Sequence, residues 1–250
     1  ELMNWQREDG TLYSPVPAGN WDKELPLQML ASIGWYGFYT QYYYSADSSF
    51  VPVIYDRMRR YLHEVWQVDK SGLVIERQGA WSWGDWGEHV DMGVLTNCWY
   101  YLALKAERAF ALQLGRDKDA DEISRMMRSI ERCFDTKFWT GSAYRSPGYQ
   151  GETDDRSQAM AVVSGLASKD KYPALTKVLK KEYHASPYME KYVLEALFQM
   201  GEPAFALERM KQRYTRMLDY AEYTTLFEGW GIGAEGFGGG TINHAWSGGP

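Results

Sequence analysis

Apolar residues recur along this chain mostly with the period of a helix. Between residues 119 and 134, for example, they return at spacings of three and four, which places them on one face of a helix. Strict alternation of apolar and polar residues, which is typical of strands, is rare, and only residues 72–77 form a candidate short strand. The pattern therefore predicts an all-α protein with about eight to ten helices.

Residues that favour helix ends mark the limits of the predicted helices. Gly115 and Gly201 follow apolar runs in the C-cap position, and Pro187 and Pro203 stand where a first helical turn tolerates proline. We expect helices over residues 25–44, 50–65, 94–114, 119–134, 154–166, 172–182, 187–200 and 203–217.

The segments between these helices are of two kinds. Some are turns of a few residues, whereas others are long and rich in Gly, Trp and Tyr; the long ones cover residues 10–23, 75–91, 139–153 and 227–241. This alternation is typical of antiparallel helical hairpins. If the hairpins close into a toroid, the long loops gather at one end and line a cleft, because function usually lies on loops above a rigid scaffold. A solenoid is disfavoured because no fixed-period repeat is evident.

The aromatic composition adds a first indication of chemistry. Aromatic residues make up 16% of the 250 residues, and the 11 Trp and 19 Tyr far outnumber the 9 Phe. Trp and Tyr combine an apolar ring with a polar tip, which suits stacking on sugar rings with hydrogen bonds to their hydroxyls. The same property suits a protein interface, so composition leaves both open.

Charge and cysteine content exclude several other classes. The net charge is −6 and the basic residues are dispersed, which argues against a nucleic-acid partner. Because apolar runs stay shorter than the roughly 18 residues that span a bilayer, we expect no membrane segment. Cys98 and Cys133 lack CxxC partners and are expected to be buried thiols. The four His show no metal-ligand spacing, so we expect neither a metal nor a cofactor. The compartment stays open, with a periplasmic or extracellular location as the working expectation.

The loop over residues 81–88 is the first candidate for a functional site. It carries Trp81, Trp83 and Trp86 within six residues, together with Asp85 and Glu88. The indole rings offer stacking faces, and the acids can accept hydrogen bonds from sugar hydroxyls. The alternative is a Trp-rich loop that closes one end of the core, with the acids in solvent.

Two further segments near the C-terminal end carry candidate groups. Glu228 lies between bulky apolar residues and a Gly-rich loop, where a carboxylate can be tuned for acid or base chemistry; it can equally be a glutamate at a helix end or rim. Asn243 is expected to cap a helix, which would direct His244 into the cleft, although a lone His is more often structural. Trp21 is a further possible stacking platform.

Residues 154–156, with the sequence Asp-Asp-Arg, precede a predicted helix. We interpret the two acids as helix N-terminal residues that interact with the helix dipole.

Taken in order, these segments resemble one family, the bacterial α-L-rhamnosidases of glycoside hydrolase family 78. The matching stretches are Gly-Asp-Trp at 84–86, Thr-Thr-Leu-Phe-Glu at 224–228 and Asn-His-Ala-Trp at 243–246. Phe227 stands where the family has Trp. The helical stretch at 192–197 and the Gln-Ala-Met-Ala at 158–161 also fit, so the resemblance covers nearly the whole chain. It implies an (α/α)6 helical barrel.

The resemblance also implies roles for individual residues. Glu228 matches the general base that activates water in an inverting reaction, Asp85 matches a rhamnose-binding acid, and His244 matches a histidine that contacts substrate. The candidates to wall the sugar pocket are Trp21, Trp83, Trp86 and Trp230. The implied partner is a carbohydrate, and the implied reaction is cleavage of terminal α-L-rhamnose.

One departure from the family pattern limits this expectation. The family's general acid lies in an Asp-Cys-Pro-x-Arg-Glu-x-x-Gly-Trp-like segment, which does not occur in these 250 residues. We therefore expect a barrel domain over residues 1–250 that is a fragment, incomplete at both ends, of a parent chain with additional β-sandwich domains. Alone, this chain is expected to be inactive or weakly active.

Three alternatives stay open. The first is an (α/α)-barrel glycosidase with a different sugar specificity, and the second is a non-catalytic carbohydrate-binding relative. The third, an isoprenoid-type α-toroid, is suggested only by the acidic pair at 154–155, which is sparse for a metal-binding motif.

Overall fold

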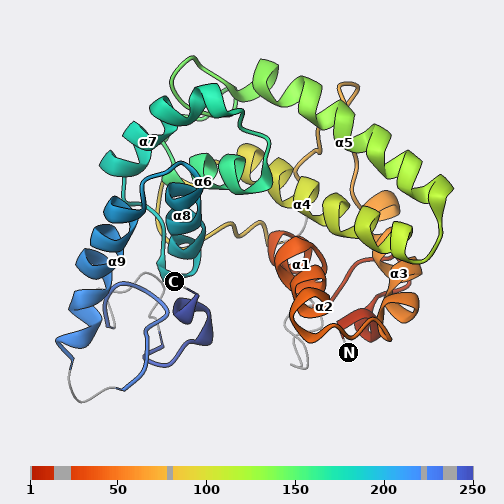
Figure 1. Ribbon diagram of the computed structural model, residues 1–250, viewed down its shortest axis with the longest axis horizontal. Coiled ribbons are helices and arrows are strands. Elements are labelled where there is room, and N and C mark those ends of the chain that lie inside the picture. Colours follow the sequence, from red (N-terminus) through yellow and green to blue (C-terminus); the bar gives the residue numbers. More distant parts are fainter. Residues whose placement is uncertain (1, 14–23, 78–80, 221–223, 233–240, 250) are drawn as a thin grey trace. The chain divides into compact units, whose positions relative to one another are not determined.

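The computed structural model describes residues 2–13, 24–77, 81–220, 224–232 and 241–249 (Figure 1). Within these ranges the regular structure is helical, and extended segments pair only through isolated bridges such as that between Val68 and Val74. The strand predicted over residues 72–77 is therefore wrong. Asp69 accepts hydrogen bonds from the backbone of Ser71 and Leu73, and this tight turn leaves room for a single bridge.

The chain divides into two compact units. Unit 1 contains Glu1–Gly84 and Thr96–Lys137, and unit 2 contains Asp85–Leu95 and Phe138–Pro250. The expectation of one domain over residues 1–250 stays a prediction, because each unit is compact by itself.

The first helices of unit 1 are shorter than the apolar pattern predicts. The expected helix over residues 25–44 consists of α1 (Pro26–Ile33), a wide π-type turn and α2 (Thr40–Ser45). The break occurs at Gly34, where an added Cβ would lie 2.5 Å from the carbonyl oxygen of Leu30 and 3.1 Å from Cα of Ala103. Glycine thus lets the backbone approach a neighbouring helix closely, and this contact ends α1.

The next predicted helix also ends in a wide π-type turn instead of continuing as a regular helix. Over residues 50–65 the structure has α3 (Val51–Arg60) followed by a π-type turn at Tyr61–Val65. Tyr61 and Leu62 of this turn are fully buried. The apolar pattern therefore identified the buried residues correctly, although it could not distinguish a wide turn from a regular one.

Two long helices form an antiparallel hairpin. They are α4 (Met92–Gln113) and α5 (Asp117–Phe138). The side chain of Arg108 in α4 donates to Ser124 in α5 at 2.7 Å. Tyr101, seven residues before Arg108, donates to Glu131, seven residues after Ser124, at 2.6 Å, so the two helices run in opposite directions. Gly115 between the helices has φ +68°, which confirms the predicted glycine C-cap.

Unit 2 is built around α6 (Asp155–Ser164), in which every residue is buried. Helix α6 packs against α7 (Tyr172–Lys181) and α8 (Pro187–Gln199), and α8 packs against α9 (Pro203–Leu218), as Figure 1 shows. Short 3-10 turns stand at Lys169–Lys171 and Ala245–Gly248. The four helices lie within two residues of the predicted limits, because their ends are set by local Pro, Ser and Gly signals.

A buried arginine joins these four helices. Arg209 of α9 is fully buried and donates to Asp155 at 2.8 Å and to Glu190 at 2.6 Å. It also donates to the carbonyl oxygens of Leu179 at 2.6 Å and Glu182 at 2.9 Å. Asp155 is fully buried and faces Arg209, which does not fit the cavity-facing metal motif that an isoprenoid-type toroid would need.

The structure also bears on the expectations about the cysteines and about membrane-spanning helices. Cys98 is buried and Cys133 is half-buried, and both remain thiols rather than forming a disulfide. Across the described ranges, no helix is both long and apolar enough to cross a membrane.

Candidate active site

The site in unit 2 begins with a buried carboxylate. Asp85 is 4% exposed. Its Oδ2 accepts a hydrogen bond from the backbone N–H of Ser186 at 2.8 Å, and its Oδ1 accepts one from the Ser186 hydroxyl. Arg156 pairs with the same carboxylate at 3.3 Å. Both oxygens of Asp85 are therefore engaged within the protein.

Arg156 holds the whole loop that follows Asp85. Its guanidinium is fully buried and donates to the carbonyl oxygens of Trp86 at 3.1 Å and Glu88 at 2.6 Å. On its other side it donates to Asp154 at 2.6 Å. Asp154 is the N-cap of α6, accepting from the backbone N–H of Arg156, so its predicted place at the helix N-terminus is confirmed. The role of Arg156 was not foreseen, because its partners lie far away in the sequence.

Burial dominates the electrostatics of Asp85. Loss of solvent raises its pKa to about 6, although the Arg156 charge and the hydrogen bonds from Ser186 act in the opposite direction. Burial raises the pKa of Asp154 as well. A buried carboxylate that is paired and hydrogen-bonded is expected to position its surroundings.

Glu228 is oriented by groups from two segments. The indole N–H of Trp86 donates to its Oε1 at 3.0 Å, and the backbone N–H of Thr241 donates to its Oε2 at 3.0 Å. The backbones of Glu228 and Thr241 also pair, with an N–H to carbonyl distance of 2.9 Å. Glu228 is half-buried. A carboxylate has about four lone-pair positions, so Oε1 can still accept a hydrogen bond from a water molecule.

A cavity of about 250 Å³ lies beside these groups. It is smaller than the roughly 300–1,000 Å³ of typical small-molecule sites, so it can hold only a small ligand. Trp86 and Trp230 form part of its wall, and the Trp230 ring is held by Arg213, whose guanidinium lies 4.1 Å from the ring centroid. The residues that line the cavity are Trp86, Gly87, Glu88, His89, Tyr183, His184, Ser186, Gly229 and Trp230.

The predicted loops do gather within unit 2. Trp86 from the second long loop contacts Glu228 from the fourth. The third loop contacts the end of the second, because the backbone N–H of Ser146 donates to Asp91 at 2.7 Å. The first long loop, over residues 10–23, lies largely outside the described residues, and so does Trp21.

The remaining predicted residues occupy other positions. Trp83 is buried in unit 1, where its carbonyl oxygen accepts from Gln28 at 3.2 Å. The ring of His244 stacks on Trp246 with 4.0 Å between centroids, and its Nδ1 is buried and makes no hydrogen bond in the described part of the chain. The expectation that Asn243 caps a helix is wrong, because a single 3-10 turn follows and His244 occupies its N-cap position without a capping bond.

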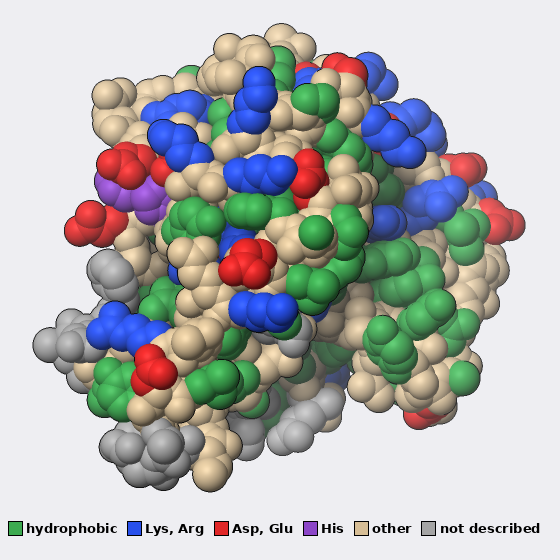
Figure 2. Space-filling model, turned by 60° about the vertical axis from the view of Figure 1, so that its left-hand side comes forward, with side chains coloured by type: hydrophobic (Ala, Val, Ile, Leu, Met, Phe, Trp, Pro, Cys, Tyr) green, Lys and Arg blue, Asp and Glu red, His purple; other side chains and the backbone are tan. Residues whose placement is uncertain are grey.

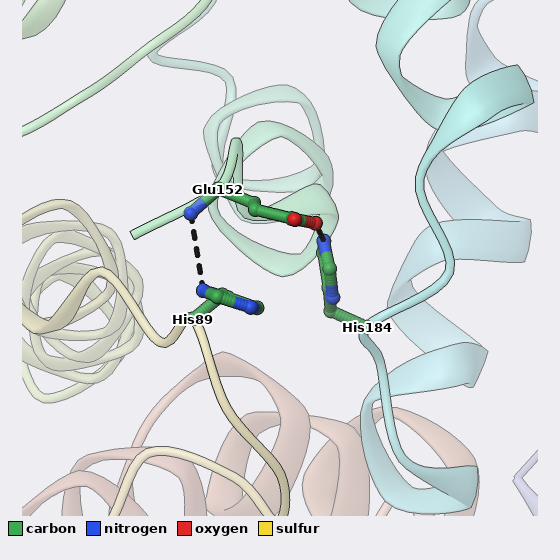
Figure 3. A group of neighbouring side chains, drawn as sticks. All are labelled: His89, Glu152 and His184. Atoms are coloured by element: carbon green, nitrogen blue, oxygen red, sulfur yellow. Dashed lines mark hydrogen bonds and ion pairs between the residues drawn. The ribbon is translucent and has the colours of Figure 1, made fainter. Parts of the chain in front are cut away.

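Ser186, His89 and His184 are among the lining residues that sequence reasoning did not single out. Ser186 carried a usable signal, since Ser before Pro187 is typical of an N-cap, and its hydroxyl does accept from the backbone N–H of Tyr188 at 3.2 Å. His89 and His184 carried none, because only the fold brings them together. With Glu152 they form a group that can hold a metal ion, with ligand atoms within 4.8 Å of one another (Figure 3).

Comparison with known proteins gives a family match. A family model described as the bacterial alpha-L-rhamnosidase 6 hairpin glycosidase domain matches residues 1–250. Its hairpin description agrees with the predicted (α/α)6 fold class. No curated protein sequence matches the chain.

Solved structures match the fold at low sequence identity. A GH78 family rhamnosidase of Bacillus sp. GL1 is 19% identical with a TM-score of 0.73, and the match covers 98% of this chain and 28% of that one. An α-L-rhamnosidase from Dictyoglumus thermophilum is 18% identical with a TM-score of 0.81, over 99% and 29% of the two chains. A rhamnosidase from Klebsiella oxytoca with rhamnose bound is 18% identical with a TM-score of 0.79, over 96% and 49%. This chain thus spans less than half the length of each.

Proposed function

The chain belongs to the bacterial α-L-rhamnosidase 6 hairpin glycosidase domain family, and we propose that it supplies the sugar pocket and catalytic base of a glycoside hydrolase. The proposed reaction releases terminal α-L-rhamnose with inversion. The observation that carries the proposal is the Glu228 carboxylate, fixed by Trp86 and Thr241 next to an aromatic-walled cavity.

Glu228 acts as the general base in this proposal. An inverting glycosidase places a water molecule between its base and the sugar, with a general acid about 6.5–9.5 Å from the base across the scissile bond. Hydrogen bonds from Trp86 and Thr241 aim the carboxylate, and its unused lone pairs accept the proton of the attacking water. Both donors come from segments that hold the base in one orientation, which favours a productive geometry.

Asp85 has a supporting role in this proposal. Its oxygens already accept hydrogen bonds from Ser186 and form an ion pair with Arg156. Asp85 therefore fixes the position of the adjacent Trp86 and does not contact the sugar directly. Trp86 and Trp230 provide apolar faces for the ring of the sugar. His244 and Trp83 stay candidates for substrate contact, as does Trp21.

The general acid is proposed to come from outside this set of residues. The family motif that carries it does not occur in the sequence. We therefore expect the 250-residue chain alone to turn over aryl α-L-rhamnosides weakly or not at all, and the parent protein, with its further β-sandwich domains, to be active. Strong turnover by the chain alone would contradict the proposed location of the acid.

A panel of aryl glycosides tests the substrate. With the parent protein, we expect release of the aryl group from α-L-rhamnoside to exceed release from other sugars by at least about 100-fold, which is well within the discrimination that a site with hydrogen bonds to its substrate can reach. Proton NMR of the first product should show the β-anomer of rhamnose, as inversion requires. Preference for another sugar would favour a different (α/α)-barrel glycosidase, and binding without hydrolysis would favour a non-catalytic relative.

A further inference from the structure

Two histidines on the wall of the cavity in unit 2 lie close to a glutamate. They come from three separate segments: His89 follows the Trp86 loop, Glu152 precedes α6, and His184 lies between α7 and α8 (Figure 3). One ligand atom from each lies within 4.8 Å of the other two. His184 Nε2 is 3.4 Å from a Glu152 oxygen. In a tetrahedral Zn²⁺ site with bonds of about 2.0–2.1 Å, two ligand atoms lie roughly 3.3 Å apart, which is close to the distance between His184 and Glu152.

The polar atoms of this group are incompletely satisfied by the protein. His184 Nε2 is buried, and within the described part of the chain it makes no hydrogen bond, although the Glu152 and Glu182 carboxylates lie at 3.4 and 3.5 Å. A buried polar atom without a hydrogen bond carries a free-energy cost. Such a cost is removed if the nitrogen has a ligand.

Acidic side chains outnumber basic ones around the two imidazoles. Glu88, Glu152 and Glu182 lie there with side chains 79%, 64% and 13% exposed, and Lys181 pairs with Glu182 at 2.7 Å. Figure 2 shows histidine side chains at the molecular surface next to acidic ones. A divalent cation can therefore reach the group from solvent, and it would offset repulsion among the acids.

The backbone at His89 is unusual. Its φ of +58° lies in the left-handed region, which non-glycine residues seldom adopt and which clusters at functional sites. The backbone N–H of Glu152 donates to His89 Nδ1 at 3.1 Å, so this lone pair is held by the Glu152 backbone and is released when the nitrogen binds a metal ion. The His89 ring lies beside Glu152 in this conformation (Figure 3).

We propose that His89, Glu152 and His184 form a binding site for a zinc-class divalent cation, independent of the proposed glycosidase activity. Two imidazoles and one carboxylate are ligands that Zn²⁺ and its neighbours prefer, whereas Ca²⁺ and Mg²⁺ require oxygen ligands. His184 binds through Nε2 and His89 through Nδ1, which exchanges the Glu152 N–H for the metal. Water completes the coordination sphere.

The acids nearby would orient the ligands. Glu88 lies 3.8 Å from His89 Nε2, where its carboxylate can accept the proton that this nitrogen carries when Nδ1 binds metal. Such outer hydrogen bonds fix the tautomer of a ligating histidine. This arrangement makes Glu88 a positioning residue for the metal rather than a direct ligand.

Metal binding would restrict the movement of the loops that form the wall of the cavity. The three ligands lie on separate loops, and two of them, His89 and His184, line the cavity next to Trp86 and Ser186. Joining the loops through one ion restricts their movement relative to each other. The sequence alone predicted no metal site, because no local spacing links residues 89, 152 and 184.

Titration of the chelator-treated chain with Zn²⁺ in a calorimeter tests the proposal. We expect one equivalent of Zn²⁺ to bind and to raise the unfolding temperature, because a ligand that binds only the folded state stabilises it. His184→Gln, His89→Gln and Glu152→Gln should each lower the affinity at least about tenfold, since even second-shell changes cost about 10–100-fold. Glu88→Gln should weaken binding less than these.

Two control variants lie outside the site. His63→Gln removes an imidazole that lies 2.9 Å from Glu107 in unit 1, and Glu208→Gln removes an exposed acid of α9; both should bind Zn²⁺ as the wild type does. Absence of binding to the wild type, or equal affinity in His184→Gln, would overturn the proposal. X-ray absorption at the zinc edge of the wild type needs no variant: two imidazole ligands support the site, and fewer than two contradict it.

Discussion

Asp85 shows how a residue that matches a family motif can act through its neighbours. Its carboxylate is buried and bonded to Ser186 and Arg156, and Arg156 in turn holds the carbonyl oxygens of the Trp86 loop. The residue that reaches the proposed base is Trp86. At the scale of single residues, the buried ion pair of Asp85 and Arg156 therefore positions the Trp86 indole, and the indole orients the Glu228 carboxylate.

The raised pKa of Asp85 predicts a specific pH dependence of stability. Its value of about 6 in the folded chain exceeds the ordinary value of 3.8, so the folded state binds the proton more tightly than the unfolded state. The contribution of Asp85 to stability is full below about pH 4 and is lost as the pH rises through about 6. Because one pKa unit corresponds to about 1.4 kcal/mol, the loss approaches about 3 kcal/mol.

Asp85→Asn removes this titration. In urea unfolding at pH 4 to 7, the free energy of unfolding of the wild type should fall relative to that of Asp85→Asn as the pH rises. Glu208→Gln, at an exposed acid of α9, serves as a control and should run parallel to the wild type. Parallel curves for Asp85→Asn would show that Asp85 has no raised pKa.

Trp86→Phe tests the hydrogen bond that orients the proposed base. The variant keeps an aromatic face but loses the N–H donor to Glu228. In the parent protein, we expect kcat for an aryl rhamnoside to fall about tenfold or more with little change in KM, because a hydrogen bond to a charged group contributes about 1.5–3 kcal/mol. Trp81→Phe, at a residue 45% exposed, should change neither constant. Unchanged kcat in Trp86→Phe would remove the indole from the mechanism.

At the scale of elements, local signals and distant contacts decide different features. The ends of α6, α7, α8 and α9 follow Pro, Ser, Asp and Gly residues that act within one turn, so the sequence predicts them closely. The break at Gly34 depends on the nearby backbone of Ala103, and no local pattern reports that contact. The same reason explains why the partners of Arg156 and Arg209, and the pairing of His89 with His184, could not be predicted.

Gly34→Ala tests this account of the break. Its Cβ would lie 2.5 Å from one carbonyl oxygen and 3.1 Å from one Cα atom, and neither can move without shifting a helix. We expect a loss of about 1–3 kcal/mol in the free energy of unfolding. Gly248→Ala meets only Leu226 Cδ1 at 3.9 Å and should change stability by less than about 0.5 kcal/mol. A neutral Gly34→Ala would mean that the break has another cause.

For the whole molecule, the sequence predicted the helical class and family, and the family match confirms both. It also predicted that the long loops carry the site. In unit 2 the second loop contacts the fourth through Trp86 and Glu228, and it contacts the third through Asp91 and Ser146. What it could not predict is which motif residues face the cavity, since burial depends on packing across the whole unit. Asp85 and Trp86 are adjacent in sequence, yet only Trp86 lines the cavity.

The central claim is that Glu228 is the catalytic base of an α-L-rhamnosidase, and its most direct test is the kinetics of Glu228→Gln in the parent protein. Glutamine keeps the size of the side chain and removes the base. We expect kcat/KM for an aryl α-L-rhamnoside to fall at least about 100-fold, the lower range for a general base, while Glu208→Gln on exposed α9 stays at the wild-type value. Activity of Glu228→Gln within about tenfold of wild type would contradict the claim.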